Sequence, residues 1–171
     1  MIESEFARPY DVRFLPGEPV TLTASAEECA ALAKRFALPA VHELHATVTL
    51  LAEGATVTVR GRLKARVVQS CAISGDDLPQ TLDEPVQLRF VPEGAAANPG
   101  EEVEISADDC DEIDYSGTQF DLGEALAQSL AIALDPFAVG PNAEEARRTA
   151  GLIDQQAAGP FAALAALKRN D

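Results

Sequence analysis

Residues Thr56 to Val68 read TVTVRGRLKARVV. These residues alternate with period two, which is typical of a β-strand with one buried and one exposed face. The apolar face contains Val57, Val59, Gly61, Leu63, Ala65 and Val67. The opposite face contains four cations at successive alternate positions: Arg60, Arg62, Lys64 and Arg66. The pattern therefore predicts a half-buried strand with a positively charged outer face.

The preceding stretch, residues 41–51, also alternates, so the two stretches together predict a long hairpin over residues 41–68. A tight turn at Glu53 and Gly54 would keep both apolar faces on the core side. On the outer face, this turn predicts the pairs Thr47–Arg60, His45–Arg62 and Glu43–Lys64. A one-residue slip would exchange the two faces, so the register is an inference from the turn.

Two helices are expected to pack on this sheet. Ser25 followed by Glu28 is typical of a capping box, and the apolar face after it ends before Pro39. Asp121 begins the clearer helix, in which leucines recur at every fourth position: Leu122, Leu126, Leu130 and Leu134. A further strand is expected over residues 82–91. The predicted fold class is therefore α+β, an antiparallel β-sheet built around the long hairpin with packed helices.

Residues 1–137 are expected to form a single α+β domain, because a chain of 171 residues is long enough for one ordinary core. Residues 138–171 are expected to form a partly mobile C-terminal helical tail, either separate from that domain or part of it, since Gly151 and Gly159 interrupt it and bulky apolar residues are few. If the tail packs against the domain, it is expected to do so through the side chains of Phe161, Leu164 and Leu167.

The net charge of −15 is concentrated in one part of the chain. Residues 90–146 contain fourteen acidic side chains and no lysine or arginine. The densest run contains Glu101, Glu102, Glu104, Asp108, Asp109, Asp111, Glu112 and Asp114. Two interpretations fit this run: a solvated loop or edge, or a docking surface for a basic partner. The overall acidity argues against general adhesion to nucleic acid, since a field of this sign repels phosphate.

Two interpretations also fit the cationic face of residues 60–66. One is a solvated strand surface whose charges limit aggregation or pair with acidic neighbours. The other is contact with phosphate, because cations spaced ~6.5 to 7 Å apart along a strand can follow a nucleic-acid backbone, and acidic groups beyond about a Debye length are screened. The chain has no tryptophan and only two tyrosines, which argues against base stacking. Contact with RNA would therefore be to its backbone and shape.

No motif in the sequence points to catalysis, a metal or a cofactor. The chain has no glycine-rich phosphate loop, no G-x-S-x-G and no H-E-x-x-H. His42 and His45 are expected on opposite faces of one strand, which argues against a shared metal. Cys29, Cys71 and Cys110 are irregularly spaced and odd in number, which favours reduced thiols. With no signal-peptide pattern and no stretch apolar enough for a membrane span, a cytoplasmic, non-enzymatic protein is expected.

Several motifs occur in an order that is similar to that of a known protein family. The basic strand runs into Cys71, an acidic region follows, and residues 120–136 read FDLGEALAQSLAIALDP. Residues 160–167 read PFAALAAL. This succession, over roughly residues 10–168, resembles the YceD family, also called the DUF177 domain, in its alphaproteobacterial branch. Its most specific piece is D-L-G-E-x-L-x-x-x-L-x-x-x-L-D-P.

The resemblance implies a bacterial or plastid protein needed for accumulation of large-subunit (23S) ribosomal RNA. Many members of the family carry C-x-x-C after the basic strand and a further cysteine after the D-L-G-E helix, which suggests a metal site. Here Ser74 stands where the second cysteine would fall, and residues 135–140 contain no cysteine. We therefore expect no zinc. The family has no established enzyme activity, so the resemblance names no catalytic residues.

The leading hypothesis is a non-enzymatic ribosome biogenesis factor that supports maturation or stability of large-subunit ribosomal RNA. Its cationic face would contact RNA backbone, while the acidic run from Glu101 to Asp114 would hold a basic large-subunit ribosomal protein or keep off non-target RNA. An alternative is an acidic protein-only adaptor or chaperone for such a ribosomal protein. A metal-dependent hydrolase that uses the carboxylates ranks third. Neither a membrane nor DNA is expected as a partner.

Overall fold

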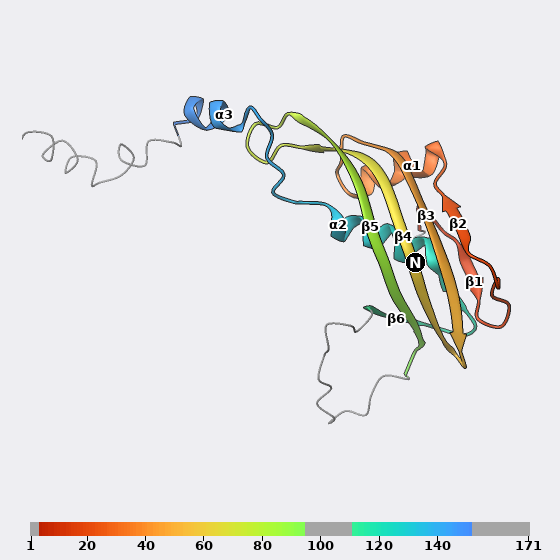
Figure 1. The fold of residues 1–171 in the computed structure, drawn as a ribbon. Helices are drawn as coiled ribbons and strands as arrows, with labels where there is room; N and C mark the ends of the chain where they lie inside the picture. The colour runs from red at the N-terminus through yellow and green to blue at the C-terminus, as the bar shows by residue number, and fades with distance from the viewer. Residues whose placement is uncertain (1–3, 95–110, 152–171) are drawn as a thin grey trace, which may run out of the picture. The chain divides into compact units, whose positions relative to one another are not determined.

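The computed structural model describes residues 4–94 and 111–151 of the chain, and it has an α+β fold (Figure 1). The strands are β1 (Pro9–Asp11), β2 (Val20–Thr23), β3 (Ala40–Glu53), β4 (Thr56–Ser70), β5 (Asp77–Pro92), β6 (Asp111–Tyr115) and β7 (Gln119–Asp121). The helices are α1 (Ala26–Arg35), α2 (Leu122–Ala133) and α3 (Ala143–Thr149). The predicted fold class is confirmed.

Five strands form the main sheet, in the order β2-β3-β4-β5-β6. β3 is antiparallel to both β2 and β4, as the alternating pattern predicts. β6 runs parallel to β5, so the sheet is mixed and not antiparallel throughout. β1 and β7 pair with each other in a separate two-stranded antiparallel sheet.

The hairpin of β3 and β4 turns at Gly54 and Ala55, because Glu53 pairs with Thr56. Gly54 has a φ of 66°, which suits glycine at the first position of a two-residue hairpin loop. The expected turn at Glu53 and Gly54 is therefore wrong, and the pairing is shifted by two residues. The observed outer pairs are Thr49–Arg60, Thr47–Arg62, His45–Lys64 and Glu43–Arg66. A shift of two keeps every side chain on its predicted face.

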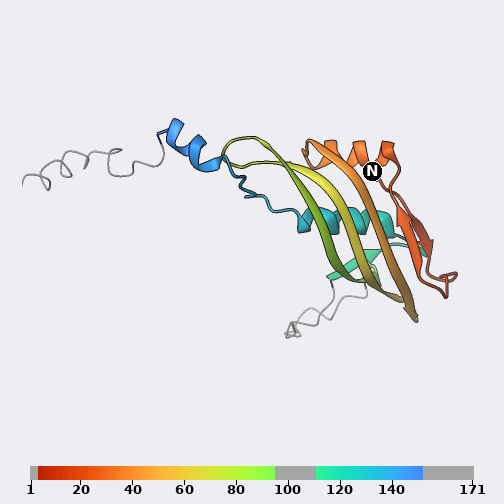
Figure 2. The same cartoon turned by 45° about the horizontal axis from the view of Figure 1, so that its top comes forward.

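The chain divides into two compact units, residues 1–68 with 79–135 and residues 69–78 with 136–171. In the first unit, α1 and α2 lie on the same face of the main sheet, and no helix of the described residues covers the opposite face, which we call the open face (Figures 1 and 2). One hydrophobic core fills the space between the helices and the sheet. Its fully buried side chains include Phe6, Leu32, Leu44, Leu63, Phe90, Leu122, Leu126 and Leu130.

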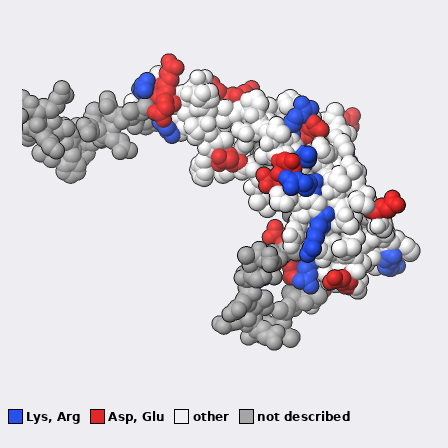
Figure 3. Space-filling model, in the orientation of Figure 1, with Lys and Arg blue, Asp and Glu red and all other residues white. Residues whose placement is uncertain are grey.

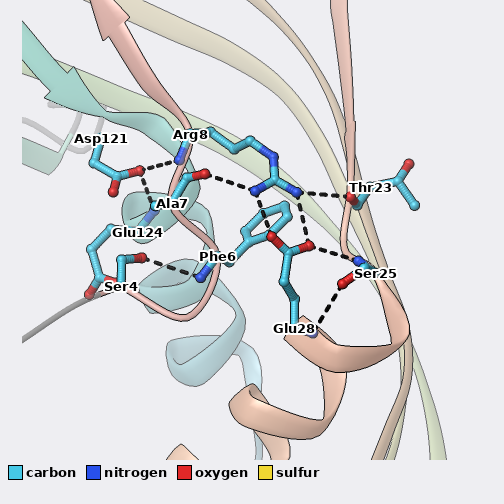
Figure 4. Close-up of polar contacts among 9 residues, drawn as sticks. All are labelled: Ser4, Phe6, Ala7, Arg8, Thr23, Ser25, Glu28, Asp121 and Glu124. Carbon is cyan, nitrogen blue, oxygen red and sulfur yellow. Dashed lines mark hydrogen bonds and ion pairs between the residues drawn. The ribbon is translucent and has the colours of Figure 1, made fainter.

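The N-terminal segment joins the beginnings of α1 and α2 (Figure 4). The Arg8 guanidinium donates to both carboxylate oxygens of Glu28, at 2.7 and 2.9 Å. Glu28 and Ser25 form the predicted capping box of α1, in which the Ser25 N–H donates to the Glu28 carboxylate at 2.7 Å. The backbone N–H of Arg8 donates to the carboxylate of Asp121, the predicted N-cap of α2, at 2.8 Å. One arginine therefore links the two helix N-termini.

The second unit joins the turn between β4 and β5 to the residues that follow α2. The backbone N–H of Ala72 donates to the carbonyl of Ala138 at 2.8 Å, and Ala138 is buried. Residues 143–149 of the predicted tail form α3. Phe161, Leu164 and Leu167 lie outside the described residues, so their expected docking stays a prediction.

Candidate functional site

The four predicted cations lie along β4 on the open face of the main sheet. All four are exposed and alternate with buried residues of the same strand: Arg60, Arg62, Lys64 and Arg66. Figure 3 shows a column of lysine and arginine side chains down this face, with carboxylates beside it. The two-residue error in register leaves this face intact, because it changes only which β3 side chains lie opposite the cations.

Three of these cations are paired with carboxylates of neighbouring strands. The Nε of Arg62 lies 2.8 Å from Oδ1 of Asp83, and the Nζ of Lys64 lies 3.5 Å from Oδ2 of the same residue. The Nε of Arg66 lies 2.7 Å from Oε2 of Glu43. Hydrogen bonds from Arg62 and Arg66 lower the pKa of Asp83 and of Glu43 respectively. Both carboxylates are therefore ionised at neutral pH and offset part of the positive charge.

Arg60 is the exception on this face. Within residues 4–94 and 111–151, no carboxylate forms an ion pair with it, and its neighbour on β3 is Thr49. A fifth cation, Arg89 of β5, is exposed and alternates with buried Leu88 and Phe90, which places it on the same open face. Its Nη1 lies 3.2 Å from Oε1 of Glu112. Sequence reasoning does not assign Arg89 to this site because alternation alone does not say which strand lies next to β4.

A hollow of about 210 Å³ lies in this face between β3, β4 and β5. Its lining includes Lys64 and Arg66 but also the carboxylates of Glu43 and Asp83. His45 also lines it, with Nδ1 3.2 Å from Oε1 of Glu43. Two ionised carboxylates in the lining oppose a phosphate group there, so the hollow by itself is not an anion site. Arg60, which has no ion-pair partner in the described part of the chain, does not line the hollow.

A β-bulge interrupts β3 between Val41 and Glu43. Because of it, Val41 and Leu44 are both buried, whereas His42 is exposed and His45 half-buried. The simple alternation that places the two histidines on opposite faces is therefore wrong here. Among the residues that the structure describes, no three His, Cys, Asp or Glu side chains are grouped so that they could hold a metal ion.

Only the last part of the predicted acidic docking surface falls within the described residues. Asp111, Glu112 and Asp114 are exposed on β6, the last strand of the main sheet. Glu112 pairs with Arg89, while Asp111 and Asp114 have no ion-pair partner in the described part of the chain. The remaining members lie outside it: Glu101, Glu102, Glu104, Asp108 and Asp109.

Cys71 lies buried in the turn of the second unit. Its Sγ accepts hydrogen bonds from the backbone N–H groups of Gly140 and Ser74, each at 3.3 Å. These donors, Gly140 first, lower the pKa of the Cys71 thiol to about 6. The Ser74 hydroxyl donates to the Asp76 carboxylate at 2.8 Å, and that carboxylate also accepts from the Asn142 amide at 3.1 Å. The sulfur therefore joins the two segments of this unit.

These residues do not fit the metal site that the resemblance implies. A structural zinc ion takes four ligands, mainly thiolate and imidazole. Besides the Cys71 thiolate, the side chains of Ser74, Asp76 and Asn142 in this unit offer a hydroxyl, a carboxylate and an amide, which together with one thiolate are a poor set of zinc ligands. Its sulfur already accepts two backbone hydrogen bonds. The donor set argues against zinc, and the absence of zinc stays a prediction.

The hydrogen-bonded sulfur predicts a pH dependence of stability. The pKa of Cys71 in the folded chain, about 6, lies below the ordinary thiol value of ~8.5. The thiolate therefore stabilises the folded chain fully above pH ~8.5, and this stabilisation is lost as the pH falls through 6. We expect the thermal stability of the wild type to rise between these pH values, and Cys71→Ala to remove that rise. Cys29→Ala is the control, because burial raises the pKa of Cys29. An unchanged pH profile after Cys71→Ala would contradict this role.

A family model matches residues 59–168 of the chain, which is more than half of its length. The chain belongs to the YceD family. The family description is "Large ribosomal RNA subunit accumulation protein YceD", which confirms the resemblance and names an accumulation role rather than a catalytic activity. The YceD match includes most of the cationic strand β4, and all of the parallel strand β6 and helix α2. Comparison with curated proteins and with solved structures found no match.

The family assigns a role in accumulation of large-subunit ribosomal RNA, and a ribosome-related partner is consistent with that role. Among the described residues of this YceD protein, no helix is long and apolar enough to cross a membrane.

Proposed function

We propose that this protein supports the accumulation of large-subunit ribosomal RNA by binding the RNA backbone through the open face of the main sheet. The observation that carries the proposal is the column of cations on β4, with Arg89 beside it on β5. These five cations outnumber the three carboxylates that pair with them: Glu43, Asp83 and Glu112. By strand alternation the exposed side chains of Glu53 on β3 and Asp114 on β6 also lie on this face, so the excess of positive charge is local to the β4 column and is not a net charge of the whole face.

The ion pairs on this face do not prevent phosphate binding. Exposed pairs contribute only about 0 to 1 kcal/mol each, so a phosphate group can replace a carboxylate at little cost. The arginines of the pairs are about half exposed, with side-chain exposures of 57% for Arg62 and 62% for Arg66. Arg60 forms no ion pair among the described residues, so a phosphate group bound there displaces none of their carboxylates. The cations would contact the phosphates of the RNA backbone, so the affinity for RNA should fall as the salt concentration rises.

The first test replaces the four β4 cations together by glutamine and measures binding of large-subunit RNA fragments at several salt concentrations. The slope of log K against log salt changes by ~0.7 for each phosphate contact with a single strand, so loss of four contacts should flatten it by roughly 3. The control is the quadruple glutamine variant of Arg13, Lys34, Arg147 and Arg148, which changes net charge equally outside the face. Equal RNA binding by both quadruple variants would refute the proposal.

A second variant separates phosphate contact from a merely solvated face. Glu43→Gln combined with Asp83→Asn releases Arg62, Lys64 and Arg66 from their partners. If the cations bind phosphate, this double variant should bind RNA more tightly than the wild type. If the face serves only solubility, its RNA affinity should not respond to the double substitution.

A second candidate function is an acidic adaptor for a basic large-subunit ribosomal protein. It is favoured by the exposed carboxylates of Asp111 and Asp114 on β6, which have no ion-pair partner among the described residues. Affinity capture with and without RNase distinguishes the two functions. A ribosomal protein that stays bound after digestion supports the adaptor, and one lost on digestion supports RNA binding.

A further inference from the structure

A groove lies at the edge of the first unit, between β6 and α2, away from the cations of β4. It encloses about 230 Å³ and is lined by residues of β5, β6, β7 and α2. This volume is below the ~300 Å³ at which sites for small-molecule ligands begin, so the groove fits a single side chain better than a cofactor. We call it the β6–α2 groove.

The inner wall of the β6–α2 groove is aromatic. Phe90, Tyr115 and Phe120 line it and are packed together, with ring centroids of Phe90 and Phe120 4.3 Å apart and those of Tyr115 and Phe120 6.2 Å apart. The hydroxyl of Tyr115 donates to the Ala55 carbonyl, which fixes its ring. Because Phe90, Tyr115 and Phe120 are only 1%, 6% and 3% exposed, they add a small apolar surface to the groove. Such a surface accepts the apolar stem of a long charged side chain. The wall therefore suits lysine or arginine.

The residues around the β6–α2 groove are acidic. Asp114, Asp121 and Glu124 line it, and neither lysine nor arginine does. Arg35 neutralises Glu124 and lowers its pKa to about 2. Asp121 accepts two backbone N–H groups through Oδ1, and Asp114 has no ion-pair partner in the described part of the chain. The charge of Asp121 is also offset by the nearby Arg8 guanidinium, so among the described residues Asp114 is the groove carboxylate that keeps its charge without an ion-pair partner.

The strand that forms one side of the groove is also the last strand of the sheet. β6 pairs with β5 on one side, and among residues 4–94 and 111–151 no strand pairs with its other side. An edge of this kind can accept an added strand from another chain through main-chain hydrogen bonds, while pockets beside it select the side chains.

We infer that the β6–α2 groove binds an extended segment of a basic protein, with one lysine or arginine side chain in the groove and the segment along β6. The acidic lining selects the cation, and the aromatic wall holds its stem. The inference rests on the second candidate function, and only for the class of partner, a basic protein. It uses none of the five cations that are proposed to bind RNA, so the two proposals can fail separately.

The test uses the full-length protein and a short labelled peptide of alternating arginine and valine, with binding measured by fluorescence anisotropy. Asp114→Asn combined with Gln128→Lys removes one anion and adds one cation at the groove, and should weaken binding roughly tenfold. The matched control combines Glu27→Gln with Ala30→Lys on exposed positions of α1, and should bind as the wild type does. A peptide of alternating glutamate and valine should not bind.

Several outcomes would overturn the inference. Equal weakening by the groove variant and the α1 control would show only attraction to overall negative charge. Tighter peptide binding after glutamine replaces Lys168 and Arg169 would mean that the chain's own terminus is the occupant. The quadruple glutamine variant of β4 should retain peptide binding, and the groove variant should retain RNA binding. Loss of both activities in the groove variant would also refute a separate peptide site.

Discussion

Replacing Gly123 by alanine is expected to lower the free energy of unfolding by roughly 3 kcal/mol, because it forces main-chain atoms apart in a packed region. A Cβ at this position would lie 1.7 Å from the carbonyl oxygen of Phe6 and 2.9 Å from the backbone nitrogen of Arg8. Neither atom belongs to a flexible side chain, so the N-terminal segment has to move away from α2. That movement would also break the contacts of Arg8 with Asp121 and Glu28 (Figure 4).

Urea unfolding followed by circular dichroism measures this loss. Gly17→Ala is the matched control, since a Cβ at Gly17 meets nothing within 4 Å and its backbone is not in the left-handed region. That control should stay within about 0.5 kcal/mol of the wild type. A Gly123→Ala variant as stable as the control would mean that the N-terminal segment does not pack against α2 as described.

Gly123 also shows where sequence reasoning stops. From the sequence D-L-G-E alone, glycine in the first turn of a helix is expected only to destabilise that helix, by up to ~1 kcal/mol relative to alanine. The reason for it is the approach of residues more than a hundred positions earlier in the chain. The local sequence predicts the cap at Asp121 and the leucine repeat of α2, but it does not predict which distant segment packs against Gly123.

For the hairpin, the sequence predicts the buried and exposed faces of the strands but not their register. Period-two alternation fixes which residues are buried, and the structure confirms both faces of β4. It does not fix the register, because a shift of two residues leaves the pattern unchanged. Only the turn distinguishes the alternatives, and there Gly54 occupies the first position of the loop rather than the second.

The candidate site depends on these unpredictable parts. The cations of β4 follow from alternation, but their partners depend on the register for Glu43 and on the neighbouring strand for Asp83. Arg89 joins the face only once β5 is known to lie beside β4. The approach of Gly140 to the sulfur of Cys71 spans 69 positions and leaves no signal in either local sequence.

The second large effect is expected at Phe6, where replacement by alanine should cost about 3 to 5 kcal/mol. Phe6 is 1% exposed and belongs to the core, although it lies near the N-terminus and far before the residues that the family model matches. The Arg8 guanidinium lies 4.4 Å from the centre of its ring. Loss of the ring therefore removes core packing and loosens the arginine that links α1 to α2.

Phe14→Ala is a close control for this change. Phe14 also lies under an arginine, with the Arg13 guanidinium 5.6 Å from its ring centre, but it is 78% exposed. Its replacement should cost less than about 1 kcal/mol, the scale of an exposed cation–π contact. Similar losses for the two variants in urea unfolding would contradict the buried role of Phe6. Because Phe6→Ala leaves every β4 cation in place, the folded fraction of this variant should still bind RNA, which separates the stability of the fold from the charge of its open face.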